Sequence, residues 1–384
     1  MDDEKLIYRT LQQHLDKLPG GFPAVASGID ISLLKRFFTP EEARLALQLS
    51  MKPEPLRKVH RRARNNGIDI TEKELEQRLH AMMRKGIILT VHEGYDDTHY
   101  CNAEFSTGGI FNFQIGHLTE DLLHDYHQYR AERNALGKSG GNVGPPLRVV
   151  PVAESIPVPG QYPVADYDDV RRMIMDAKGK IAVANCICRL TSQILESGCR
   201  KTDLLEACLM IGPDHARRHV EMGIGRYVSK EEALAILDKA RRDGLVLQPE
   251  NTQNPEAICC CCGDCCVLLK AFTRHPRPVE MFITNYVAGF NAGLCNGCGI
   301  CIDKCQLNAR EMIDGVAALD LDRCIGCGNC VVHCAQGANS LRRKEPVNVP
   351  VEDKYTYNIG VLSGRVGKWN ALKTRARMML GMKM

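Results

Sequence analysis

The amino-acid sequence predicts an α+β protein built from several domains. Its 384 residues exceed the usual length of a single domain. Helical patterns dominate residues 1–105 and end in an alternating, strand-like pattern. Cysteine dominates the second half, where 18 of the 19 cysteines lie between Cys186 and Cys334. We therefore expect an N-terminal domain of helices and strands, followed by cysteine-rich domains with a separate chemistry.

The composition is that of a globular protein in a reducing compartment. Hydrophobic residues make up 44% and charged residues 25%, which excludes a disordered or fibrous chain. No apolar run reaches the about 18 residues of a membrane helix, and the acidic start MDDEKL differs from a signal peptide. We therefore expect a cytoplasmic protein whose thiols are metal or cluster ligands rather than disulfides. The net charge of +4 implies no polyanionic partner for the whole chain.

Residues 1–105 carry signals for three helices and a hairpin. Pro40 begins one helix, the basic segment LRKVHRRAR forms another, and Thr71 with Glu74 forms a capping box that begins a third, which Gly86 ends. The runs IILTV and THYCNA then alternate as two strands around the turn EGYDD. Three helices followed by a ribbon resemble a winged-helix domain.

Residues 106–278 contain a boundary and then most of the remaining helical signals. Residues 106–160 hold a helix and a stretch rich in Gly and Pro, which predicts a linker. Residues 161–278 are expected to form a cysteine-rich helical domain. In it, Ser229 and Glu232 repeat the capping box before the strand-like run LVLQ.

Eight cysteines near the C-terminus form two sets with identical spacing, C-x2-C-x2-C-x3-C. They are Cys295, Cys298, Cys301 and Cys305, then Cys324, Cys327, Cys330 and Cys334. Such a loop turns three thiolates onto one iron–sulfur cluster while the fourth reaches a second cluster. Residues 279–342 resemble the bacterial-type ferredoxin with two [4Fe-4S] clusters. The resemblance implies that Cys295, Cys298, Cys301 and Cys334 hold one cluster, and that Cys324, Cys327, Cys330 and Cys305 hold the other.

The sequence departs from that family at one position in each set. The family usually has Pro after the fourth cysteine, whereas this chain has Gln306 and Ala335, which restores a backbone N–H and loses a fixed φ. No ligand is lost, but hydrogen bonds to sulfur tune the reduction potential of a cluster. A pair of zinc sites is the alternative interpretation of the eight cysteines.

Ten further cysteines lie between residues 186 and 266, which is more than one site uses. They are Cys186, Cys188, Cys199, Cys208, Cys259, Cys260, Cys261, Cys262, Cys265 and Cys266. Neighbouring side chains in an extended chain point apart, so one run can supply two sites. We expect one or two further iron–sulfur clusters, with the first four cysteines as one group and the CCCCGDCC run supplying the rest. Zinc sites and reactive or inert thiols remain alternatives.

The chain ends in a basic tail. Residues 343–384 carry nine basic and three acidic side chains, a difference of +6. On a helix, one apolar stripe is flanked by basic residues, and it consists of Trp369, Leu372, Ala376, Met379 and Leu380. We expect this segment to dock on an acidic protein or a membrane surface, and a terminal helix packed on its own domain is the alternative.

These features divide the chain into five parts. They are a winged-helix-like domain (1–105), a helix and linker (106–160), a cysteine-rich middle domain (161–278), a two-cluster ferredoxin domain (279–342) and a basic tail (343–384). As a whole the chain resembles the poorly characterised multi-cluster iron–sulfur proteins of anaerobic bacteria. This resemblance implies an electron carrier and no particular substrate.

The predicted function is the relay of single electrons through the ferredoxin clusters and the middle clusters to or from a partner oxidoreductase. One alternative is a redox-sensing winged-helix regulator that binds DNA. Another is an oxidoreductase with its own substrate site at a middle cluster. Residues 1–135 hold 18 basic and 20 acidic residues, a difference of −2, so we do not expect a nucleic-acid partner. No glycine-rich nucleotide or nicotinamide motif occurs, and no catalytic residue is identified.

Overall fold

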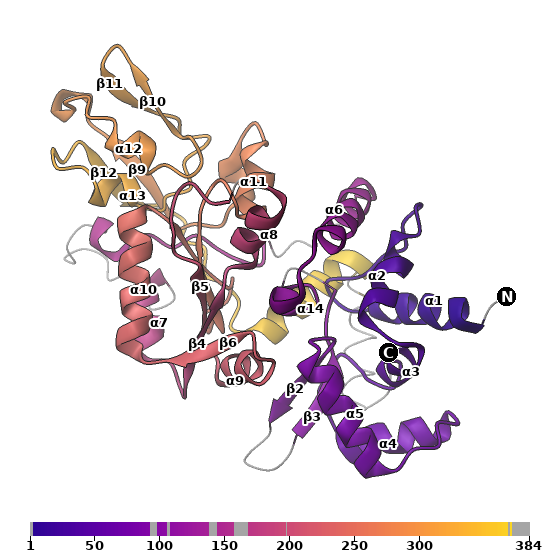
Figure 1. Cartoon of the computed structure of the whole chain (residues 1–384). Helices are drawn as coiled ribbons and strands as arrows, with labels where there is room; N and C mark the ends of the chain where they lie inside the picture. Colours follow the sequence, from indigo (N-terminus) through magenta and orange to yellow (C-terminus); the bar gives the residue numbers. More distant parts are fainter. Residues whose placement is uncertain are drawn as a thin grey trace. The chain divides into compact units, whose positions relative to one another are not determined.

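The computed structural model describes residues 3–92, 98–105, 108–137, 144–156, 168–196, 198–367 and 369–370. It is a mixed α+β structure with several small antiparallel sheets (Figure 1). The chain divides into two compact units. The first comprises Met1–Val143, Arg217–Ile224 and Asn358–Met384, and the second comprises Gly144–Ala216 and Gly225–Tyr357.

The first unit combines helices with a three-stranded antiparallel sheet of order β1-β3-β2. Its elements are α1 (Asp3–Leu15), α2 (Ile29–Phe37), α3 (Pro40–Ala46), β1 (Glu54–Pro55), α4 (Leu56–Asn65), α5 (Glu72–Arg84), β2 (Ile88–His92), β3 (Thr98–Asn102), η1 (Asn112–His117) and α6 (Glu120–Ala135). The predicted hairpin is confirmed, because β2 pairs with β3 from Ile88–Asn102 to His92–Thr98. Its predicted turn at residues 93–97 lies outside the described residues.

Local signals place the helices of this unit. The predicted capping box of Thr71 and Glu74 is present at the start of α5, and Thr39 with Glu42 forms a second one at α3, where Pro40 is the first helical residue. Aromatic side chains fill the core, where the ring of Phe22 lies 4.3 Å from that of Phe105.

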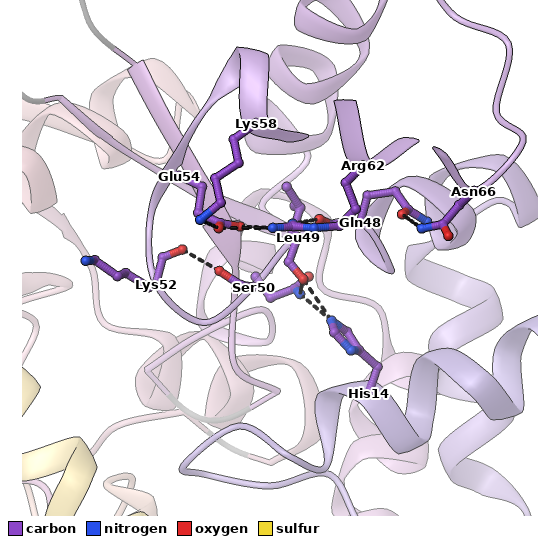
Figure 2. A network of polar contacts seen from close by, with 10 residues as sticks. His14, Gln48, Leu49, Ser50, Lys52, Glu54, Lys58, Arg62 and Asn66 are labelled. Carbon is purple, nitrogen blue, oxygen red and sulfur yellow. Dashed lines mark hydrogen bonds and ion pairs between the residues drawn. The ribbon is translucent and has the colours of Figure 1, made fainter. Parts of the chain in front are cut away.

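Two basic side chains of helix α4 form ion pairs inside the first unit (Figure 2). Arg62 donates to both carboxylate oxygens of Glu54, at 3.0 and 2.8 Å, and Lys58 lies 2.5 Å from the same carboxylate. Burial alone would raise the pKa of Glu54, but the hydrogen bonds from Lys58 and Arg62 outweigh it and lower that pKa. These two cations of the predicted basic segment are therefore held in the fold.

The predicted tail, residues 343–384, contains helix α14 (Lys354–Val366). Arg365 near its end donates to the carboxylate of Asp16 at 2.9 Å and to the carbonyl oxygen of Leu18 at 2.7 Å, so this basic residue is engaged within the first unit. Trp369 is 77% exposed. The rest of the predicted apolar stripe, Leu372, Ala376, Met379 and Leu380, lies outside the described residues.

The cysteine-rich part of the second unit is built on a five-stranded antiparallel sheet of order β6-β4-β5-β8-β7. Its elements are η2 (Ala153–Ser155), α7 (Val170–Met175), β4 (Ile181–Asn185), α8 (Ile187–Leu195), β5 (Glu206–Met210), β6 (Gly225–Val228), α10 (Lys230–Asp243), β7 (Val246–Pro249), β8 (Ala257–Cys261) and α11 (Val267–Thr273). Helix α9 (Pro213–Glu221) has residues in both units.

The expectation of a helical middle domain was wrong. Strands β4, β5 and β8 are short and largely apolar runs, and such a run does not distinguish a buried strand from a piece of buried helix. Helices α7 and α10 pack together, and their apolar residues share one core with those of the sheet (Figure 1). As expected, Ser229 caps α10 by accepting from the N–H of Glu232.

The last part of the second unit carries the two cysteine sets. Its elements are η4 (Pro278–Met281), β9 (Tyr286–Phe290), η5 (Ala292–Leu294), α12 (Ile300–Asp303), β10 (Arg310–Ile313), β11 (Val316–Leu319), α13 (Asn329–Val332) and β12 (Asn339–Arg343). Strand β9 pairs with β12, and β10 pairs with β11. Asp314 and Gly315 form the β10–β11 turn with φ of 48° and 78°, as an Asp-Gly hairpin turn requires.

Among the described residues, no helix combines the length and the apolar character needed to cross a membrane.

Candidate functional site

The eight cysteines of the two sets surround two hollows. One is lined by Cys305, Cys324, Cys327 and Cys330. The other is lined by Cys295, Cys298, Cys301 and Cys334. We call them the Cys324 hollow and the Cys295 hollow. Each takes three cysteines from one set and the fourth from the other set, which is the grouping that the ferredoxin resemblance implies.

Glycines allow the backbone to wrap around these hollows. Gly326 has φ +65°, and a Cβ at this position would lie 2.1 Å from the carbonyl oxygen of Tyr286. Gly299 and Gly328 lie in the left-handed region directly before α12 and α13. Any other residue at Gly326 would be strained and would clash with strand β9.

Backbone N–H groups point at several of the sulfurs. The N–H of Ala309 donates to Cys305 Sγ at 3.2 Å, and the N–H of Gly297 donates to Cys295 Sγ at 3.4 Å. Burial raises the pKa of the Cys330 thiol to about 11, against the lowering effect of Arg310. At Cys334, burial acts to raise the pKa, but hydrogen bonds from Asn339 and Ala338 outweigh it and lower the pKa. Donors of this kind stabilise bound thiolate and cluster sulfur.

Arg310 gives a direct test of whether these hollows fit anionic clusters. It is 4% exposed, its Nη2 lies 3.6 Å from Cys330 Sγ, and its charge also acts on Cys301 and Cys305. Its Nε and Nη1 have no hydrogen-bond partner among the described residues. A buried cation with unsatisfied donors is costly unless negative charge lies beside it. The residues therefore fit two anionic clusters, one in each hollow, with Arg310 near ligands of both.

Gln306, one of the two departures from the ferredoxin pattern, has a structural role. Its side chain accepts from the N–H of Gly263 at 2.8 Å and donates to the carbonyl oxygen of Gly244 at 2.9 Å. Asn329 donates to the same carbonyl oxygen at 2.7 Å. Proline at position 306 could make neither bond. The departure thus ties the ferredoxin part to the cysteine-rich sheet.

Six middle cysteines form one continuous group, which we call the six-thiol group. Neighbouring thiols interact in the order Cys186, Cys188, Cys266, Cys261, Cys259 and Cys208. Strands β5 and β8 supply three of them, since Cys208 on β5 is paired with Cys259 on β8, which also carries Cys261. Interactions with neighbouring thiols and burial raise the pKa of Cys259 and Cys261 well above the usual range. A bound metal would displace those protons.

Three other middle cysteines gather around an acidic residue. One ligand atom from each of four side chains lies within 4.8 Å of the others, and we call these residues the Cys199 tetrad: Cys199, Cys262, Asp264 and Cys265. The structure thus separates Cys199 from Cys186, Cys188 and Cys208, with which the sequence pattern had grouped it. Cys260 joins neither group, because its side chain packs with Ile258 in the apolar core on the other side of β8.

The six-thiol group adjoins the Cys324 hollow. Cys261, Cys266, Cys259 and Cys327 belong to one apolar cluster together with Leu307 and Ile325. Arg189 lies at the six-thiol group and the tetrad. It is 2% exposed, donates to the carbonyl oxygens of Leu204 and Cys260 at 2.7 Å, and its charge acts on Cys186 and Cys262.

Sequence reasoning missed Asp264, Arg310 and Asn329. Asp264 had a signal, since it lies between Cys262 and Cys265 in the run CCCCGDCC. The other two had none, because their roles depend on distant partners.

The comparison with known families agrees with this geometry. Residues 288–345 match the 4Fe-4S dicluster domain. No curated protein and no solved structure matches the chain. The matched segment holds all eight cysteines of the two hollows, and its family implies two [4Fe-4S] clusters and a role in electron transfer. The Cys199 tetrad adds a candidate metal site in the middle region. Residues 288–345 are thus a 4Fe-4S dicluster domain.

Proposed function

We propose that this protein is an electron carrier that relays single electrons between its dicluster domain, a further cluster at the six-thiol group, and a partner oxidoreductase. The observation that carries the proposal is the pair of hollows, each lined by four cysteines drawn from both sets. When bound, a [4Fe-4S] cluster supplies reversible one-electron transfer. The chain supplies the thiolates, the N–H donors to sulfur and the buried charge of Arg310.

The grouping of the side chains around the two hollows supports a ligand assignment. We assign Cys305, Cys324, Cys327 and Cys330 to one cluster and Cys295, Cys298, Cys301 and Cys334 to the other. The six-thiol group offers more than four buried or half-buried thiols that contact one another in series, which supports a further cluster there. Its shared apolar packing with Cys327 supports electron exchange between that site and the Cys324 hollow, because this packing places the two sites next to each other.

The first unit supports a protein partner rather than a nucleic acid. In this unit helices α4 and α5 lie between strand β1 and the hairpin of β2 and β3. We propose that it is a winged-helix-like module that docks a redox partner. Lys58 and Arg62 on α4 are paired with the carboxylate of Glu54, and exposed Glu72, Glu74 and Glu76 on α5 would repel phosphate. The basic tail is a second candidate docking segment.

The experiment replaces one cysteine of each set with alanine. Cys334→Ala should perturb the cluster of the Cys295 hollow and leave that of the Cys324 hollow near normal, whereas Cys305→Ala should do the reverse. Iron per chain and paramagnetic spectra of the reduced protein, prepared without oxygen, report the two clusters separately. The unmodified protein should hold more than the about eight iron atoms of two [4Fe-4S] clusters.

Two results would contradict the proposal. If Cys334→Ala disturbs only the cluster of the Cys324 hollow, the assignment is wrong. If the unmodified protein carries about eight iron atoms and Cys261→Ala leaves both spectra unchanged, the six-thiol group holds no cluster.

A further inference from the structure

The Cys199 tetrad differs in geometry from the cysteines of the two hollows. Among the described residues it is the one set of His, Cys, Asp or Glu ligand atoms found to converge as a metal site does. Cys199 Sγ lies 3.6 Å from Cys262 Sγ and 3.6 Å from Asp264 Oδ1. The thiols of the two sets instead line two open hollows, and among the described residues they form no such convergent group.

These short separations match a single metal ion. Zinc binds sulfur at about 2.3 Å and carboxylate oxygen at about 2.0–2.2 Å, so tetrahedral coordination places two sulfurs about 3.8 Å apart and a sulfur and an oxygen about 3.6 Å apart. A [4Fe-4S] cluster binds each thiolate to a different iron and therefore holds the sulfurs farther apart. The tetrad has the size of a one-metal site, and four protein ligands are what a closed structural zinc site requires.

The surrounding groups orient these ligands. The N–H of Arg200 donates to Asp264 Oδ2 at 2.8 Å, which leaves Oδ1 beside Cys199. Cys262 and Cys265 are 1% and 6% exposed, and the charge of Arg189 acts on Cys262. Partners of this kind fix the direction of a ligand and balance the negative charge of three thiolates and one carboxylate.

We propose that Cys199, Cys262, Asp264 and Cys265 bind one zinc ion in a closed S₃O site that is separate from every iron–sulfur cluster. The ion cross-links the loop at Cys199 to the turn between β8 and α11. Gly263 lies within that turn and donates to Gln306, so the zinc also holds the contact between the sheet and the dicluster domain. The site goes beyond electron transfer and does not depend on it.

The test compares two neighbouring cysteines in the full-length protein, expressed with iron and zinc in the medium and purified without oxygen. Cys262→Ser should remove the single zinc per chain and leave the iron content unchanged. Cys266→Ser, the matched control from the six-thiol group, should lower the iron content and leave the zinc. X-ray absorption at the zinc edge, which iron does not obscure, should show three sulfur ligands and one oxygen ligand. Asp264→Cys should retain zinc with four sulfur ligands, which shows coordination even if Cys262→Ser does not fold.

Three outcomes would overturn the proposal. The first is an unmodified protein without zinc in which Cys262→Ser lowers the iron content by a whole cluster. The second is zinc that survives Cys262→Ser. The third is an Asp264→Cys variant whose zinc environment is unchanged, which would exclude Asp264 as a ligand. None of these outcomes bears on the assignment of the two ferredoxin clusters, which the Cys334 and Cys305 variants test.

Discussion

Arg310 should set the reduction potential of the dicluster domain. A cluster that gains an electron becomes more negative, so a nearby buried cation stabilises its reduced form. Arg310 lies 3.6 Å from Cys330 Sγ and has no carboxylate partner among the described residues. Arg310→Gln removes the charge and keeps a side chain that donates hydrogen bonds. The reduction potential should therefore become more negative.

The size of the shift follows from Coulomb's law. At 3.6 Å, two unit charges interact by about 1 kcal/mol in a water-like dielectric and by about 5 kcal/mol at an effective dielectric constant of about 20. For one electron this range corresponds to about 50–200 mV. The added electron spreads over the cluster and lies on average farther from Arg310 than Cys330 Sγ does. We therefore expect a shift in the lower half of this range, about 50–100 mV.

The assay is a redox titration monitored by the paramagnetic signal of the reduced clusters, on variants with equal iron content. Arg310→Lys keeps the charge and should shift the potential much less than Arg310→Gln. Arg342→Gln removes an exposed charge from strand β12 and should have little effect, because solvent and salt screen it. A potential for Arg310→Gln within about 20 mV of the unmodified protein, well below the Coulomb range, would refute the argument. An equal shift in Arg342→Gln would attribute the effect to net charge instead.

Two further variants test how the hollows are built. Gln306→Ala removes the acceptor for the Gly263 N–H and should lower the free energy of unfolding by about 1–3 kcal/mol. The clusters should then bleach at a lower guanidinium concentration. An unchanged guanidinium midpoint would show that this bond is dispensable. Gly326→Ala places a Cβ 2.1 Å from the carbonyl oxygen of Tyr286 and should lower the iron per chain. The control is Gly337→Ala, because Gly337 has a similar φ of +64° but no atom within 4 Å of a Cβ added there. This variant should lower the free energy of unfolding by only about 1–2 kcal/mol, which is the cost of holding alanine in the left-handed conformation. Equal iron contents in the two glycine variants would contradict the steric argument.

Some features of this chain were predictable because they depend on residues close together in sequence. The capping box of Thr71 and Glu74, the Asp-Gly turn of β10 and β11, and the spacing of the two cysteine sets act within a few residues. Such signals can be recognised in the sequence without knowledge of the rest of the fold. The dicluster domain was therefore predictable.

Other features depended on the tertiary structure because their partners are far apart in the chain. Strand β8 sends Cys259 and Cys261 to one face and Cys260 into the core on the other, and only its pairing with β5 and β7 determines which thiols meet. Cys199 reaches Cys262 across 63 positions. Arg310 follows Cys305 closely in sequence, but its contact with Cys330 requires the fold to close around both hollows. The spacing of the cysteines thus established the kind of chemistry, whereas strand pairing and burial decided which side chains share a site, because contacts between distant segments leave no local pattern in a single sequence.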